Sequence, residues 1–289
     1  MGGPRTVLSA HRVPAPLLFV ISGLSMYLGA AVAVWLFAEI NPASVAWLRQ
    51  LGAAVVLLAW RRPGRMAWRG RAFWLAATFG LVTAAMNLAI YEAIARLPLG
   101  TAVALEFAGP VTVAAVGSRT RRDVGALLLV TIGVLLIADV RWAGSPLGVT
   151  FALASAALWA GYILLGQRVV SAGLGVDGLA VGFAVATVVL SPLALGTGPV
   201  WGSPRLLVLG IGVGVLSTVL PYALDQVVLR RLGRAAFAVL LALLPVSAAL
   251  TGLVLLHQVP GLVEGLGIVA VVVGVALRSR EPPAGPEPR

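Results

Sequence analysis

The sequence has 289 residues, of which 60% are hydrophobic and only 11% are charged. This composition is too apolar for an ordinary water-soluble globule and indicates a protein whose surface lies in lipid. The net charge of +11 comes from arginines spread over short connections, which is not the single basic face that a nucleic-acid partner requires. The absence of cysteine excludes disulfides, thiolate metal sites and a thiol nucleophile.

Ten apolar stretches are long enough to cross about 30 Å of hydrocarbon as helices, so the sequence predicts an all-α integral membrane fold. The predicted transmembrane ranges are 16–38, 41–60, 72–93, 97–117, 123–140, 147–166, 177–196, 206–229, 234–256 and 260–277. Prolines near the predicted helix starts support these boundaries, because first-turn N–H groups have no partner inside a helix. They are Pro16, Pro42, Pro98, Pro146, Pro204 and Pro260.

The distribution of arginine predicts the orientation. With a cytoplasmic N-terminus, seventeen of the 21 basic residues fall in segments on the inner side, whereas Arg96, Arg141 and Arg205 fall outside and Arg49 lies within a span. The positive-inside rule therefore predicts a multi-pass membrane protein with both termini in the cytoplasm. The alternative is a first span that is a signal peptide cleaved near 31–33, but this span is long for a signal sequence.

The two halves of the chain carry a related pattern. Pro98 is followed twelve residues later by Pro110, and Gly233 is followed twelve residues later by Pro245. Two units of five helices each would have opposite membrane orientations, because the number of spans in each is odd, and such inverted repeats are typical of transporters. Chance similarity between apolar segments is the alternative. The predicted units are a first repeat at 1–143, a second repeat at 144–280 and a disordered cytoplasmic tail at 281–289.

Two charged residues lie inside predicted spans at a similar depth. Arg49 is eight residues into the second span and Glu106 nine into the fourth, which places both about 12 Å from the outer surface. Because charges inside a bilayer are costly, each is a candidate site residue. Glu106 can meet a substrate ammonium or a proton, and Arg49 can meet a substrate carboxylate. The alternative is a buried ion pair that sets helix register without touching substrate.

Three prolines inside predicted spans, Pro110, Pro221 and Pro245, are candidate helix breaks. Each lacks an amide hydrogen, which frees the carbonyl four residues earlier and bends the helix. Irregular backbone at membrane depth is tolerated where it lines a cavity or is satisfied by neighbours. The breaks therefore predict a central cavity, with kinking for helix packing as the alternative. The freed carbonyls are those of Glu106, Ser217 and Leu241.

Several further polar residues are candidates for substrate binding. Asn87 and Tyr91 lie in the outer half of the third span, and Tyr162 and Tyr222 lie towards the inner ends of the sixth and eighth spans. Glu92, next to Tyr91, is near the outer interface and is expected to be solvated. These positions predict polar groups on more than one side of the cavity.

Two other features are assigned to structure. Asp225 is near enough to the cytoplasmic interface to pair with Arg168 or Arg230, which is its expected role. Gly210 and Gly214 are four residues apart in the eighth span and predict close helix packing. They do not form a dinucleotide-binding loop, because no strand precedes them and the spacing differs.

No recognised catalytic or nucleotide-binding motif occurs in the sequence. A metalloprotease helix motif, a Walker loop and a Gly-x-Ser-x-Gly elbow are all absent. We therefore expect neither an enzyme nor a bound metal or cofactor. Uphill transport by such a chain has to draw on an ion or solute gradient, or on the membrane potential.

Residues 159–168 (WAGYILLGQR), within ten spans in two halves, resemble the EamA branch of the drug/metabolite transporter superfamily. Residues 97–110 (LPLGTAVALEFAGP), 86–87 and 216–225 (LSTVLPYALD) are similar to segments of its amino-acid exporters. The pattern departs from those exporters at three places. Where they have glutamate, this chain has Asp225, Leu244 before Pro245, and Gln258 after His257.

The resemblance implies export of small amino acids such as threonine or homoserine across the inner membrane, in exchange with protons, from a two-fold pseudo-symmetric cavity. We expect a monomer or homodimer. If the missing glutamates carry protons in the family, proton coupling here rests on Glu106 or differs in stoichiometry. A zwitterion needs partners of both signs, and Arg49 with Glu106 supplies them. One alternative is a non-transporting membrane scaffold. Another is an exporter of apolar or aromatic amphiphiles whose cavity is dominated by Trp35, Trp47, Trp159 and Tyr162.

Overall fold

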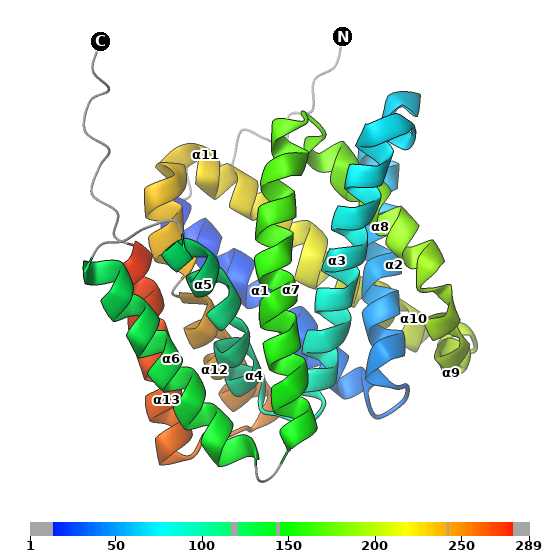
Figure 1. Cartoon of the computed structure of the whole chain (residues 1–289). Helices are drawn as coiled ribbons and strands as arrows, with labels where there is room; N and C mark the ends of the chain where they lie inside the picture. Colours follow the sequence, from blue (N-terminus) through cyan, green and yellow to red (C-terminus); the bar gives the residue numbers. More distant parts are fainter. Residues whose placement is uncertain (1–13, 117–120, 143–144, 242, 280–289) are drawn as a thin grey trace, which may run out of the picture.

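The computed structural model describes residues 14–116, 121–142, 145–241 and 243–279, and within these ranges all regular secondary structure is helical (Figure 1). The predicted repeat boundary at 143–144 and the predicted tail at 281–289 lie outside the described residues. The helices are α1 (Ala15–Leu36), α2 (Pro42–Arg61), η3 (Arg65–Trp68), α3 (Gly70–Ile94), α4 (Leu99–Glu106), α5 (Ala108–Val116), α6 (Arg121–Trp142), α7 (Pro146–Ser171), α8 (Gly175–Val189), η4 (Ser191–Thr197), α9 (Gly198–Trp201), α10 (Pro204–Gly214), the π-helical segment η5 (Val215–Val219), α11 (Leu220–Leu241), α12 (Leu243–Leu256) and α13 (Leu262–Ser279).

Five of the described helices are long and apolar enough to cross a membrane, against the ten spans predicted. They are Ala15–Leu36, Pro42–Arg61, Gly70–Ile94, Pro146–Val169 and Pro204–Asp225. A sixth span results if α8 is joined to the segment Ser191–Trp201, which bends away from it by 66°. The shorter apolar helices are Leu99–Val113, Val124–Ile137, Leu243–Leu256 and Leu262–Leu277. By length and composition, therefore, the described residues contain five or six spans.

Proline positions and helix starts agree along the chain. Pro42 and Pro204 occupy the first turns of α2 and α10, and Pro98 directly precedes α4. The side chain of Ser203 caps α10 by accepting a hydrogen bond from the Leu206 amide at 3.4 Å. The prediction that proline marks these starts is confirmed, and the reason is that a first-turn amide has no partner inside the helix.

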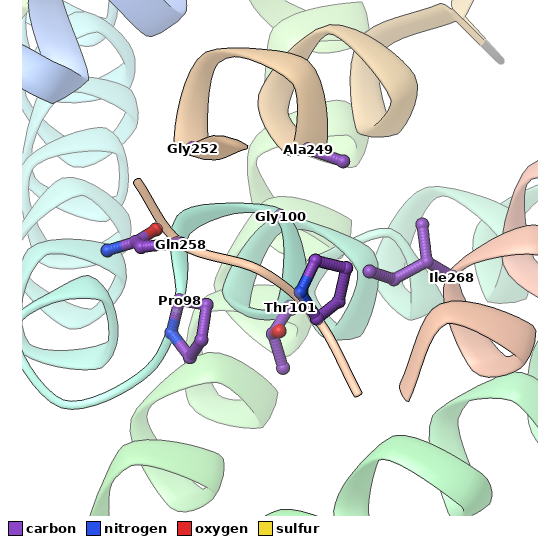
Figure 2. A pocket seen from close by; sticks show the side chains of 8 residues that line it. Pro98, Gly100, Thr101, Ala249, Gly252, Gln258 and Ile268 are labelled. Carbon is purple, nitrogen blue, oxygen red and sulfur yellow. The ribbon is translucent and has the colours of Figure 1, made fainter. Parts of the chain in front are cut away.

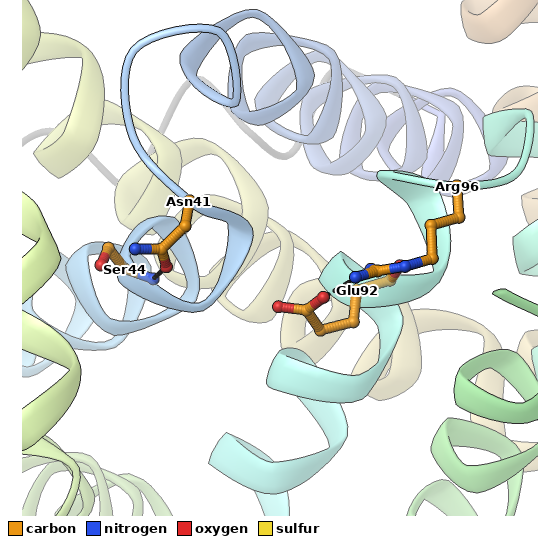
Figure 3. Close-up of polar contacts among 4 residues, drawn as sticks. All are labelled: Asn41, Ser44, Glu92 and Arg96. Carbon is orange, nitrogen blue, oxygen red and sulfur yellow. Dashed lines mark hydrogen bonds and ion pairs between the residues drawn. The ribbon is translucent and has the colours of Figure 1, made fainter. Parts of the chain in front are cut away.

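Polar side chains form hydrogen bonds and an ion pair at the start of α2 and at the end of α3 (Figure 3). Asn41 caps α2, because its Oδ1 accepts a hydrogen bond of 2.8 Å from the Ser44 amide. At the end of α3, Arg96 Nη1 lies 2.5 Å from Glu92 Oε2 in an ion pair one helical turn apart. Glu92 was expected to be merely solvated, and that expectation was wrong because Arg96, in the turn just after α3, reaches back to it.

Glycines allow the helices around the centre to approach closely. A Cβ on Gly80 of α3 would lie 2.1 Å from the carbonyl oxygen of Gly182 in α8. A Cβ on Gly214 of α10 would lie 2.5 Å from the carbonyl oxygen of Arg49 in α2, and one on Gly210 would lie 3.0 Å from the Leu48 side chain. The predicted packing role of the two α10 glycines is thus confirmed. Close packing of α2 with α10 and of α3 with α8 fixes the walls of the cavity described below.

The chain does not form a loop where one was predicted between the eighth and ninth spans. Helix α11 continues through 230–233 and ends at Leu241, and α12 begins at Leu243. Three of the four residues at 230–233 are arginine or leucine, which favour helix, so a basic segment that marks the membrane surface need not interrupt the backbone. The structure therefore does not separate the predicted ranges 206–229 and 234–256 by a loop.

Candidate functional site: the central cavity

A cavity of about 150 Å³, which we call the central cavity, lies where α2, α3, α7, α8, η5 and α11 meet. It contains one arginine and one aspartate, together with hydroxyl, amide and phenol groups. Its lining residues are Arg49, Thr83, Met86, Asn87, Tyr162, Leu179, Phe183, Ser217, Thr218, Tyr222 and Asp225. Four of the predicted site residues, on α2, α3, α7 and α11, are thereby brought together from distant parts of the sequence.

Arg49 is held by the π-helical segment on the opposite wall. Its Nε donates to Thr218 Oγ1 at 3.1 Å and its Nη2 donates to the Ser217 carbonyl at 3.1 Å. Its guanidinium carbon also lies 5.4 Å from the centre of the Tyr91 ring. The carbonyl of Ser217 is the one that Pro221 was predicted to free, since a proline amide cannot occupy it. Within the described residues these are the hydrogen bonds of the guanidinium, so donors remain for a ligand.

Asp225 faces the central cavity and not the cytoplasmic surface. Its Oδ1 accepts a hydrogen bond of 2.7 Å from the Ser22 hydroxyl of α1. The expected pairing with Arg168 was wrong: within the described residues Asp225 forms no salt bridge, and the side chain of Arg230 lies outside them. The reason is helix phase, because a residue three positions after Tyr222 lies on the same face of α11. The cavity therefore holds two charged groups of opposite sign.

Glu106 is buried behind the cavity wall. Its Oε1 lies 2.5 Å from the Ser155 hydroxyl of α7, and the same hydroxyl lies 3.1 Å from the carbonyl of Met86, a lining residue. Glu106 and Arg49 form no salt bridge within the described part of the chain. The ion pair considered from their similar depth is thus absent, because Ser217 and Thr218 give Arg49 nearer acceptors.

Buried polar groups beside the cavity lack partners. Asn87 Nδ2 donates to Gln50 Oε1 at 3.4 Å, but Gln50 Nε2 has no hydrogen bond, and neither has the Tyr91 hydroxyl. Both side chains are 1% exposed. Tyr91 does not line the cavity and packs edge-on against Phe37. Sequence reasoning missed Gln50, although an amide next to Arg49 inside an apolar run was the available signal.

Only some of the aromatic residues predicted to bind substrate line the central cavity. Tyr162 and Tyr222 line the cavity, and Tyr162 stacks on Phe79 with ring centres 4.9 Å apart. Trp159 instead packs edge-on against Phe107 and is not a lining residue.

The helix breaks lie close to the predicted prolines. Helix α4 ends four residues before Pro110, α11 ends four residues before Pro245, and η5 ends two residues before Pro221.

A second polar cluster joins α4 to the start of α13, and Figure 2 shows two of its members, Thr101 and Gln258, on either side of a small pocket. Gln258 Oε1 accepts a hydrogen bond of 2.8 Å from the Leu99 amide, and Glu264 accepts one from the Thr101 hydroxyl and one of 3.3 Å from the Gly261 amide. A space of about 10 Å³ beside Thr101 and Gln258 has room for about one water, and Glu264 does not line it. Glu264 is 1% exposed and was not identified from the sequence. We call Thr101, Gln258 and Glu264 the α4–α13 cluster.

The described residues contain no group of three or more His, Cys, Asp or Glu side chains positioned to hold a metal ion. The groups that line the central cavity offer charge and hydrogen bonds to a ligand. Arg49 can engage a carboxylate through its planar donors, and Asp225 can engage an ammonium.

Comparison with known proteins identifies relatives of the whole chain. The EamA-like transporter family matches residues 146–280. The threonine/homoserine exporter RhtA of Salmonella typhimurium is 32% identical over 285 residues, covering 95% of this chain and 96% of the relative. RhtA of Escherichia coli K12 is 31% identical over 259 residues, covering 88% of each chain. A solved crystal structure shares the fold with a TM-score of 0.57 and 19% identity, covering 91% of this chain and 94% of its own.

Proposed function

This chain belongs to the EamA-like transporter family and is a multi-pass protein of the inner membrane, and from that premise we propose that it exports small amino acids by alternating access. Its relatives at 31% and 32% identity are named threonine/homoserine exporters, so the proposed substrates are amino acids of that size. The proposed energy source is exchange with protons.

We further propose ten transmembrane helices arranged as two inverted repeats. The shorter apolar helices would complete the number of spans. In this arrangement α1, α2, α3, α4–α5 and α6 are equivalent to α7, α8, the span Pro204–Asp225, the end of α11 with α12, and α13. The packing supports this relation, because the equivalent helices α2 and α8, α4 and α12, and α6 and α13 each contact one another. In addition, α3 contacts α7 and α8, as α10 contacts α1 and α2.

Both termini are proposed to be cytoplasmic. In this topology, seventeen of the 21 basic residues of the sequence fall in segments on the same side as the N-terminus. The basic segment of η3 and the start of α3 belongs to that side, as does the end of α7. Reactivity of single cysteines introduced into this naturally cysteine-free chain would test the orientation directly.

The observation that carries the proposed substrate class is the presence of Arg49 and Asp225 in one small cavity. A zwitterionic amino acid carries a carboxylate and an ammonium, and a site of low polarity has to offer a partner to each. The threonine or homoserine hydroxyl would find partners among Thr83, Asn87 and Ser217, which line the same space.

The size of the cavity argues against the aromatic amphiphile as substrate. Sites for drug-sized ligands occupy roughly 300–1,000 Å³, whereas the central cavity has about 150 Å³. Trp35 is 52% exposed, and the indole of Trp47 is engaged by the Thr187 carbonyl at 2.9 Å. Two of the tryptophans on which that alternative rests, Trp35 and Trp47, therefore do not contribute to the lining of the central cavity.

Glu106 is the proposed proton carrier. The Ser155 hydroxyl has one proton but lies within hydrogen-bond distance of two acceptors, Glu106 Oε1 and the Met86 carbonyl. Both contacts are hydrogen bonds at once only when Glu106 is protonated and donates to Ser155. Loss of the proton turns the hydroxyl towards Glu106 and away from Met86, which connects the protonation state to the wall of the central cavity.

Transport by purified protein in proteoliposomes tests the proposal. Vesicles loaded with labelled threonine should show saturable efflux above protein-free vesicles, and an acidic exterior should accelerate it. Flux equal to that of protein-free vesicles would refute the proposed substrates. Saturable flux that ignores the pH gradient would refute proton coupling alone.

Two threonine analogues separate the roles of the charges. N-acetylthreonine lacks the ammonium and threonine methyl ester lacks the carboxylate, so neither should compete well with threonine. In Asp225→Asn the penalty for acetylation should shrink, and in Arg49→Gln the penalty for esterification should shrink. An identical ranking of the analogues in wild type and both variants would contradict the assigned partners.

A further inference from the structure

A second large hollow lies between the first turns of α3 and the last turns of α7. It has a volume of about 810 Å³, and none of its lining residues lines the central cavity. Because Arg71 is the second residue of α3 and Ser171 the last of α7, the hollow is at one end of both helices. Its walls carry Arg71 and Leu75 from α3 and Leu164, Gln167, Arg168 and Ser171 from α7. We call it the α3–α7 groove.

The two arginines of the groove have no acidic partner in the described structure. The salt bridges found there join Arg61 to Asp177 and Arg96 to Glu92. Asp177, the acidic residue in the first turn of α8, is thus already paired at 3.0 Å. The groove therefore presents two positive charges on facing helices, with the exposed Gln167 beside them. Guanidinium groups in such an arrangement match the oxygens of a phosphate.

The groove is apolar one turn further into the bundle. Leu164 lies four residues before Arg168, about 6 Å along the helix axis, and is 51% exposed. Leu75 lies four residues after Arg71 on the facing wall. Trp74 on α3 is 70% exposed, as expected for an aromatic residue at a membrane interface. Charge at the helix ends and apolar side chains deeper in the same hollow form an amphipathic site.

We propose that the α3–α7 groove binds an anionic phospholipid, whose phosphate lies between Arg71 and Arg168 and whose acyl chain lies against Leu75 and Leu164. Basic hollows between transmembrane helices suit anionic headgroups, and the attraction is greatest at the membrane surface. A free phosphate ion would use the arginines but would leave the leucine wall empty. The proposal rests on the membrane location of the chain and is independent of the transported solute.

Titration of detergent-purified, delipidated protein tests the site. Phosphatidylglycerol should raise the melting temperature saturably, whereas phosphatidylcholine and inorganic phosphate should not. Replacing both arginines in Arg71→Gln/Arg168→Gln should weaken phosphatidylglycerol binding about thirtyfold, since each basic side chain near an anionic lipid surface contributes on the order of a fivefold factor. The matched control Arg65→Gln/Arg69→Gln removes the same charge from exposed positions outside the groove and should leave binding within about twofold.

Three results would overturn the proposal. Equal weakening of binding in the control pair would indicate diffuse attraction between the lipid and the protein surface. Unchanged binding in Arg71→Gln/Arg168→Gln would exclude the groove as the binding site. An equal shift of the melting temperature with inorganic phosphate would show that the ligand is a free anion and not a lipid. A variant of unchanged charge provides an independent check. Ala172 lines the groove at an exposed position just beyond α7, so Ala172→Trp should obstruct the space beside Arg168 and reduce the phosphatidylglycerol shift. A full shift in that variant would also overturn the proposal.

Discussion

The central cavity and the α4–α13 cluster both contain a carboxylate within the helical bundle, but they differ in what surrounds it. In the cluster, Glu264 accepts hydrogen bonds from Thr101 and Gly261 and does not line the space of about 10 Å³ nearby. In the cavity, Asp225 and Arg49 face about 150 Å³ of space. A buried acid is thus not by itself a sign of a binding site. The available volume and the hydrogen-bond donors that remain for a ligand distinguish a binding site from a contact that only stabilises the fold.

Arg49→Gln should produce the largest change in transport. A hydrogen-bonded charge contributes about 1.5–3 kcal/mol, so the substrate concentration for half-maximal export should rise roughly 10- to 100-fold. Folding should be retained, because Arg49 is half-buried and forms no ion pair within the described residues. Efflux from proteoliposomes and the melting temperature measure the two effects. Unchanged export would show that Arg49 does not bind the substrate, and the central cavity would then have no better claim to be the binding site than the α4–α13 cluster.

Glu106→Gln should abolish the dependence of export on a pH gradient. Glutamine can donate to Ser155 but cannot exchange a proton, so the variant resembles the protonated form permanently. Exchange of labelled for unlabelled threonine without a gradient should remain measurable, which provides the internal control. Gradient-driven export equal to wild type would reduce Glu106 to a structural role.

Glu264→Gln tests the other side of the comparison. The substitution weakens hydrogen bonds to Thr101 and Gly261 in a buried site, so the free energy of unfolding should fall by about 1–3 kcal/mol. Export per folded molecule should remain within about twofold, because Glu264 does not line the central cavity. Chemical denaturation and proteoliposome efflux measure these effects separately. A large loss of export at unchanged stability would show that the cluster takes part in transport.

Much of this architecture was accessible from apolar length, proline spacing and intramembrane charge. Proline positions predicted helix starts because their physical cause is local. The phase of α11 was not accessible in the same way, and Asp225 was assigned to an arginine at the surface when it faces the cavity with Tyr222. The segment 230–233 was read as a loop because charge indicates the membrane surface but leaves the backbone conformation open. Gln50 and Glu264 were missed because side-chain partners depend on helix packing.

Tyr91→Phe should have the smallest effect and addresses a buried hydroxyl beside the central cavity that has no hydrogen-bond partner. The Tyr91 hydroxyl is buried without a hydrogen-bond partner, so its removal relieves a desolvation cost and should change the free energy of unfolding by about 1 kcal/mol or less, towards greater stability. The ring beneath Arg49 is retained, so substrate affinity should be unchanged if the contact is with the ring face. Tyr91→Leu is the matched control, since it removes the ring and should lower affinity by a few-fold. A loss of transport in Tyr91→Phe would instead identify the hydroxyl as a substrate partner and extend the cavity towards Gln50, the other buried group without a partner.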